Sequence, residues 1–114
     1  MSDCLFCKIA RGEIPSDKVY EDDDILVFRD IHPQAACHML IIPKAHVSGL
    51  NGLEFAGDAL LASLLRAAGT AAKKAGIDES GYRLVSNCGK DACQSVQHLH
   101  FHVLGGEQLS ERMT

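Results

Sequence analysis

The stretch that most constrains this fold lies near the C-terminus, where three histidines alternate with apolar residues. His98, His100 and His102 occupy every second position, and a leucine, a phenylalanine and a valine fill and follow the gaps. Side chains alternate between faces in an extended strand, so the pattern predicts a strand over 94–104 with all three imidazoles on one face. The apolar face must then pack into a core, and the chain must build a sheet around this strand.

Three imidazoles in register form a chemically unusual surface. Gln94 and Ser95 come just before them, and this polar approach favours a site for nucleophilic, proton-transfer or metal chemistry. The alternative interpretation is a solvated strand face that carries histidines without a function.

Length and charge narrow the class of protein. The 114 residues predict one domain over 1–114, long enough to bury a core without disulfides. The net charge of -4 gives no basic surface for nucleic acid or membranes, and no apolar run approaches the roughly 20 residues that span a bilayer. Five cysteines, an odd number with no leader peptide before them, favour a reducing, cytoplasmic location.

The pattern of apolar residues predicts an α+β fold, with a mainly antiparallel sheet of about five strands. Besides the histidine strand, strands are expected at 18–21, 25–30, 38–43 and 82–86, the first two forming a hairpin around three aspartates. A short helix is expected at 4–10 and an arm without regular structure at 105–114.

One long helix is expected over 55–75, because leucines and alanines recur there at spacings of three and four. Gly76 is placed to end this helix, and Asn51 or Asp58 is placed to cap its start. Its wide apolar stripe predicts packing on one face of the sheet, with a possible extension to a partner subunit.

Two cysteines at the start of the chain, Cys4 and Cys7, form a CxxC pair. In a cytosolic protein this spacing suggests a thioredoxin-like redox site or half of a zinc site. The redox motif expects a preceding strand, which the position of the pair does not allow. Zinc is therefore favoured, with His46 and His98 as candidates for the other two ligands.

Three other polar residues lie at strand ends. Asp30 is interpretable as a solvated cap or as a carboxylate that binds ribose hydroxyls. His38 is interpretable as a hydrogen-bonded core residue, and it joins the site only if its strand lies beside the histidine strand. Hairpin geometry places Asn87 and Ser95 at one end of the sheet, where loop amides can face an anion.

The stretch 98–104 resembles the histidine-triad (HIT) signature, His-x-His-x-His followed by two apolar residues. The likeness extends to 6–14, 30–33, 38–46 and 87–96, which resemble the nucleoside-phosphoramidase (Hint) branch of that family, of the bacterial type with an N-terminal CxxC. The resemblance therefore covers nearly the whole chain.

The resemblance implies a nucleotidyl hydrolase or transferase that cleaves purine nucleoside 5′-phosphoramidates or aminoacyl adenylates and releases AMP or GMP. It implies that His100 is the nucleophile and becomes nucleotidylated, while His102 contacts the phosphate and Ser95 the leaving atom. His38 would support the triad. Substrate-binding residues implied in the same way are Asp30 for ribose, Asn87 and Gln94 for phosphate, and Leu5, Phe6, Ile9, Phe28 and Ile31 for the base.

The chemistry of these residue types agrees with such roles. A neutral imidazole can attack phosphorus, and fixed donors can stabilise the phosphoryl oxygens, so no metal is required for catalysis. The resemblance also implies a structural zinc ion held by Cys4, Cys7, His46 and His98, and a two-fold homodimer whose sheets join.

Two departures from the family and three alternatives stay open at this point. Ala92 and Cys93 stand where the Hint branch usually has small glycines, so the backbone angle at Cys93 is in question, and the chain has no tryptophan for its arm. Within the same chemistry the alternative is dinucleoside polyphosphate hydrolysis. Outside it, the chain would be a nucleotide-binding regulatory protein with incidental turnover, or a purely structural zinc module.

Overall fold

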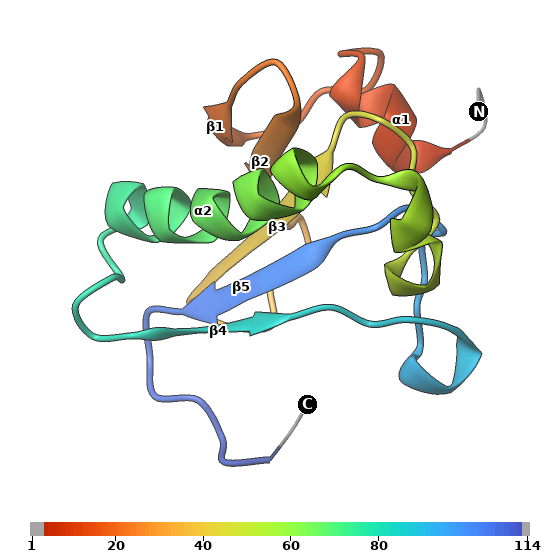
Figure 1. Ribbon diagram of the computed structural model, residues 1–114. Helices are drawn as coiled ribbons and strands as arrows, with labels where there is room; N and C mark the ends of the chain where they lie inside the picture. The colour runs from red at the N-terminus through yellow and green to blue at the C-terminus, as the bar shows by residue number, and fades with distance from the viewer. Residues whose placement is uncertain (1–3, 113–114) are drawn as a thin grey trace.

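Five antiparallel strands form one sheet in the order β1-β2-β3-β5-β4 in the computed structural model, which describes residues 4–112 (Figure 1). The strands are β1 (Lys18–Glu21), β2 (Ile25–Arg29), β3 (Cys37–Pro43), β4 (Tyr82–Val85) and β5 (Phe101–Gly105). The strand expected at 38–43 begins one residue earlier, and the one expected at 82–86 ends one residue earlier. The predicted α+β class and its antiparallel sheet are confirmed.

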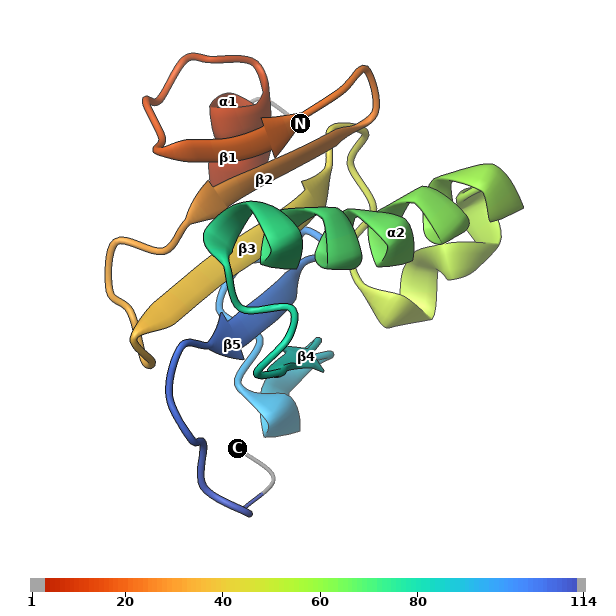
Figure 2. The same cartoon turned by 90° about the vertical axis from the view of Figure 1, so that its left-hand side faces the viewer.

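Helices lie on both faces of this sheet. The long helix α2 (Asp58–Ala75) crosses one face, and the short helix α1 (Leu5–Ala10) packs on β2 and β3 from the other side (Figures 1 and 2). Two short 3-10 helices, η1 (Leu50–Phe55) and η2 (Lys90–Ala92), lie in connecting loops. None of the helices in residues 4–112 is long and apolar enough to cross a bilayer.

Strict alternation along the strands divides the interior into two cores. On the α2 face, Val27, Met39 and Val103 pack with alanines and Leu64 of the helix. On the α1 face, Phe28 and Leu40 pack with Phe6 and Ile9 and their neighbours. Both faces of β2 and β3 are thus covered, which explains why β3 reads as a continuous apolar run.

The histidine strand is shorter than its alternating pattern suggests. We expected a strand over 94–104, but regular pairing begins at Phe101, so His98 and His100 precede β5. The reason is a long-range contact, because the N–H of Leu99 donates to the carbonyl of Val47 instead of to a neighbouring strand. The alternation nevertheless continues through this extended segment, since Leu99 and Val103 both pack on the α2 face.

The long helix also begins later than expected. The segment 50–55 is a separate 3-10 helix, and α2 starts at Asp58 with Gly57 as its N-cap residue. The predicted caps, Asn51 and Asp58, are wrong, because no side chain makes an N-cap hydrogen bond there. Gly76 ends the helix as predicted, in a left-handed conformation with φ of 77°.

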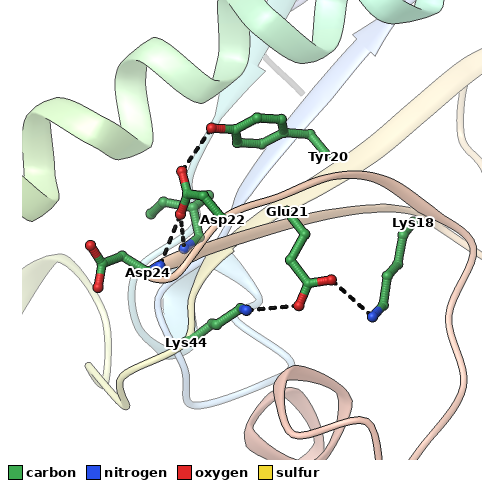
Figure 3. A network of polar contacts seen from close by, with 7 residues as sticks. Lys18, Tyr20, Glu21, Asp22, Asp24 and Lys44 are labelled. Atoms are coloured by element: carbon green, nitrogen blue, oxygen red, sulfur yellow. Dashed lines mark hydrogen bonds and ion pairs between the residues drawn. The ribbon is translucent and has the colours of Figure 1, made fainter.

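The acidic turn between β1 and β2 is more than a solvated loop (Figure 3). One oxygen of Asp22 accepts hydrogen bonds from the N–H groups of Asp24 and Ile25, at 2.9 and 2.8 Å. Glu21 pairs with both Lys18 and Lys44, at 2.9 and 2.7 Å. These contacts fix the turn next to the end of β3, where the chain leads on to His46.

The C-terminal arm returns along the edge strand. After β5 ends at Gly105, the guanidinium of Arg83 on β4 donates to the carbonyls of Ser110 and Arg112, at 2.7 and 3.4 Å. The arm is without helix or strand as far as residue 112, as expected, and its last two residues lie outside the described part.

Candidate active site and metal site

The register between β3 and β5 brings His38 to the histidine row. Leu40 lies opposite His102 and His38 opposite Leu104, so the two histidines share the α1 face of the sheet. Their rings meet, with His38 Nε2 and His102 Nδ1 2.9 Å apart. The strand that carries His38 therefore lies beside the histidine strand, which is the arrangement under which His38 joins the site.

The protons in this pair are fixed by a backbone group. The N–H of Gln34 donates to His38 Nδ1 at 2.9 Å, and burial lowers the pKa of His38, so the neutral ring carries its proton on Nε2 and donates it to His102. Burial, with the nearby His100 and His38, lowers the pKa of His102 to about 4. Neutral His102 then carries its own proton on Nε2, as a donor for an anion.

His100 has the opposite tautomer. Its Nδ1 donates to the carbonyl of His98 at 2.7 Å, which leaves the lone pair of Nε2 free. The residue is 4% exposed, and its ring packs against the ring of Phe6 at 5.1 Å. Its own carbonyl accepts a hydrogen bond from the hydroxyl of Ser86 at 2.8 Å. An imidazole so oriented is suited to act as a nucleophile.

A cavity of about 330 Å³ opens beside these histidines, between α1, β2 and the segment that leads into β5. Its walls are mainly apolar, and Asp30 and Ser95 are among its few polar groups. Every residue expected for the base lines it: Leu5, Phe6, Ile9, Phe28 and Ile31. A cavity with apolar walls and a few convergent polar groups fits an aromatic, polar-edged ligand such as a nucleoside.

The two residues expected to bind the phosphate, Asn87 and Gln94, differ in whether their side chains are available. Asn87 lies in a neighbouring hollow of about 400 Å³ that meets the first at His102. The side chain of Gln94 is fully engaged with the backbone, since its oxygen accepts from the N–H of Gly89 at 2.9 Å. Its nitrogen donates to the carbonyls of Ser48 and Val96. Gln94 therefore braces the loop that presents Ser95.

The loop before Ser95 contains the departure noted in the sequence. Cys93 has φ of 62° and ψ of 40°, and no other residue of 4–112 apart from glycines has a positive φ. This is the conformation in which a glycine is free of strain and a cysteine is not.

A second cluster lies on the other side of α1. Ligand atoms of Cys4, Cys7, His46 and His98 all lie within 4.8 Å of one another. The Sγ–Nδ1 distances are 3.4 Å for Cys4 with His98, 3.5 Å for Cys7 with His98 and 3.3 Å for Cys7 with His46. Sulfur and nitrogen ligands of a tetrahedral zinc ion are about 3.5 Å apart, so the four residues fit that ion.

The surroundings of this cluster also fit a metal. His98 is fully buried and its Nε2 donates to the carbonyl of Pro43 at 2.8 Å, which leaves Nδ1 as the ligand atom. Burial and the neighbouring Cys4 raise the pKa of the Cys7 thiol, so a cation beside Cys7 would favour its thiolate form.

Asp30, His38 and His102 also bring possible ligand atoms together, but their donor chemistry does not fit a metal. His38 Nδ1 accepts a backbone N–H, so Nε2 carries a proton and has no lone pair for an ion. Asp30 Oδ2 lies 3.4 Å from this nitrogen. The triplet is therefore a hydrogen-bonded histidine pair with a carboxylate beside it.

Several site residues carry no clear signal in the sequence. Gln34 and Ser86 act through one hydrogen bond each, at positions set by loop conformation. Arg83 and the arm residues Leu109 and Ser110 line the second hollow, and only the folded arm brings them there. Leu40 lines the cavity, and its even spacing from His38 could have placed it on the histidine face.

Comparisons with known proteins agree with this geometry. A model of the HIT domain family matches residues 11–109. The chain is 44% identical to a purine nucleoside phosphoramidase of Escherichia coli over 105 residues, covering 92% of this chain and 88% of the relative. It is 50% identical to a 14 kDa zinc-binding protein of Zea mays over 112 residues, covering 96% and 86%.

Among solved structures, a HIT family hydrolase from Clostridium thermocellum superposes with a TM-score of 0.95 at 40% identity. That alignment covers 100% of this chain and 99% of the other. A structure named as a HIT family hydrolase from Legionella pneumophila gives 0.91 at 50% identity, over 96% and 97%. Relatives of this likeness share the fold throughout.

Proposed function

The chain belongs to the HIT domain family, and from that premise we propose that it hydrolyses purine nucleoside 5′-phosphoramidates or aminoacyl adenylates through a nucleotidyl intermediate on His100. The observation that carries the proposal is the pair of opposite tautomers. His100 presents a lone pair at the cavity, and His102 presents an N–H beside it. One group suits attack on phosphorus and the other suits its developing negative charge.

The reaction follows from these positions. His100 Nε2 forms a bond to the α-phosphorus while the bond from phosphorus to the leaving nitrogen breaks. In a phosphoramidate, the Ser95 hydroxyl hydrogen-bonds that nitrogen, which takes up a proton from solvent water and departs as an amine. In an aminoacyl adenylate the leaving atom is a carboxylate oxygen, which departs without taking up a proton. Water then attacks the phosphorus and gives up a proton to the solvent, the bond from phosphorus to His100 Nε2 breaks, and the nucleoside monophosphate is released. The His98 carbonyl stabilises the positive charge that the ring of His100 acquires in the first step.

Substrate orientation is assigned to the walls of the cavity. The purine lies between the apolar side chains that surround Phe28, and Asp30 accepts hydrogen bonds from the ribose hydroxyls. One oxygen of Asp30 already accepts from the N–H of His32 at 2.8 Å, which fixes the carboxylate for this role. Asn87, on the far side of His102, is left to contact a phosphate oxygen.

Turnover assays with a series of adenosine compounds test the proposal. The protein should cleave adenosine 5′-phosphoramidate to AMP, and His100→Ala should abolish turnover while calorimetry still detects AMP binding. Faster cleavage of a diadenosine polyphosphate would favour the alternative chemistry. Tight AMP binding by the unaltered protein without turnover of any phosphoramidate would contradict the proposed activity and favour a regulatory role.

We also propose that the metal is zinc and that its role is structural. Two sulfurs and two imidazole nitrogens complete a tetrahedron, so no position is left open for a substrate. The ion would link the N-terminal segment to the segment before β5. The N-terminal segment includes α1, whose side chains Phe6 and Ile9 line the pocket proposed for the base.

A homodimer and a cytoplasmic location complete the proposal. β4 is an edge strand of the sheet, and Leu65 on α2 and Phe55 at the end of η1 are 58% and 86% exposed, so a free edge and exposed apolar side chains support a second copy. Sedimentation should therefore give twice the mass of the chain. None of the five cysteines, all of which lie in the described residues, forms a disulfide, which supports a reducing compartment.

A further inference from the structure

His98 belongs to both clusters. Its ring contributes Nδ1 to the metal site, while its backbone carbonyl accepts the Nδ1 proton of His100. The other ring nitrogen is held by the carbonyl of Pro43, and the side chain is completely buried. The orientation of residue 98, and hence of its carbonyl, is therefore set by the metal site together with the carbonyl of Pro43.

Phe6 makes a second connection between the clusters. It lies between Cys4 and Cys7, and the edge-to-face contacts of its ring reach both His98, at 5.9 Å, and His100, at 5.1 Å. The helix that carries it, α1, has six residues and no side-chain N-cap. Helices this short are not stable alone, so the position of Phe6 depends on what anchors α1.

We propose that the metal ion held by Cys4, Cys7, His46 and His98 positions the nucleophile, because it fixes the His98 carbonyl and the Phe6 ring that together orient His100. His98 is then a positioning residue as well as a ligand. The inference rests on the proposed role of His100. Without the ion, weak thiol–imidazole hydrogen bonds and the edge contact of Phe6 connect α1 to residue 98, and the ring of His100 is freer to turn and to exchange its proton between nitrogens.

The direct readout is the tautomer of His100, measured by nitrogen NMR of labelled protein at one pH. Zinc-loaded protein should show a single tautomer with the proton on Nδ1. Stepwise chelation should shift the His100 nitrogens toward averaged values, and kcat should fall about tenfold, the change expected for one lost hydrogen bond, with KM nearly constant. Unchanged His100 nitrogen signals in metal-free protein would overturn the inference.

His46→Ala is the sharpest variant, because His46 is an exposed ligand that touches neither His100 nor Phe6 in the contacts described. Its folding can be monitored by the amide signals of β2 and β3 while zinc chloride is added. The His100 signals should be averaged at low zinc and return to the single tautomer at saturation. His100 nitrogen signals that do not change with zinc occupancy would overturn the inference.

Cys88→Ser is the matched control, since this cysteine lies outside the metal cluster. It should keep the zinc affinity and the His100 tautomer of the unaltered protein. The two proposals fail separately. Zinc-loaded protein that cleaves no phosphoramidate contradicts the proposed function, whereas an active protein whose His100 tautomer is independent of zinc contradicts the positioning role.

Discussion

Replacement of Cys93 by glycine should stabilise this protein, although it removes a side chain. Cys93 has a left-handed backbone conformation, with φ of 62°, which costs a residue with a Cβ about 1–2 kcal/mol. Glycine avoids that strain but loses about 0.5–1 kcal/mol more backbone entropy on folding. The cysteine side chain is exposed, so little packing is lost. The net gain should be on the order of 0.5–1 kcal/mol.

The neighbouring residue supplies a matched control. Ala92 ends the 3-10 helix η2, and its φ is not positive. Ala92→Gly therefore has the same entropic cost without relief of strain, and it should destabilise the protein by about 0.5–1 kcal/mol. Two glycine substitutions at adjacent positions are thus expected to have opposite signs.

Thermal unfolding followed by circular dichroism, at equal protein and zinc concentrations, measures both effects. One kcal/mol corresponds to roughly 3–5 °C for a domain of this size. Cys93→Gly should melt higher than the unaltered protein and Ala92→Gly lower. Equal destabilisation by the two substitutions would refute the assignment of strain to Cys93.

Three further measurements test separate parts of the site. Ile31→Ala should raise the KM about five-fold, because Ile31 lines the cavity and its truncation removes roughly 1 kcal/mol of apolar contact with the bound base. It should leave stability unchanged, because Ile31 is 85% exposed in the free protein. An unchanged KM would place the base elsewhere. Elemental analysis should find about one zinc per chain, and protein that contains none and takes up none would exclude the site. Acidification from pH 6.5 to 4 should lower the free energy of unfolding of the unaltered protein by about 2 to 3 kcal/mol more than that of His102→Gln. The reason is that burial lowers the pKa of His102 to about 4 in the folded protein, so the unfolded chain binds that proton first. The same dependence of the free energy of unfolding on pH in both proteins would contradict this.

The faces of the sheet could be predicted from the sequence because side-chain alternation depends only on extended backbone. It holds from His98 to Val103 although pairing starts at Phe101. The start of that pairing could not be predicted, because it is set by a contact of Leu99 with Val47, some fifty positions away. Gly76 was identifiable as a helix end from its residue type, whereas the start of α2 has no capping side chain to detect.

The candidate site divides in a similar way. Residue types and the resemblance together selected four candidate metal ligands and the residues expected for the base, and the structure brings each group together. The proton positions could not be predicted, because Gln34 and the carbonyl of His98 act through the backbone, where side-chain identity carries no information. Gln94 shows the same limit, since its partners are backbone groups of two loops.

A crystal structure with AMP bound would show whether His100 faces the phosphate of a nucleotide. We expect the purine in the cavity beside Phe28, the ribose hydroxyls on Asp30 and the phosphorus next to Nε2 of His100, with an oxygen accepting from His102 Nε2. A phosphate bound away from His100, or a base outside this cavity, would contradict both the nucleophile and the substrate class proposed for the chain.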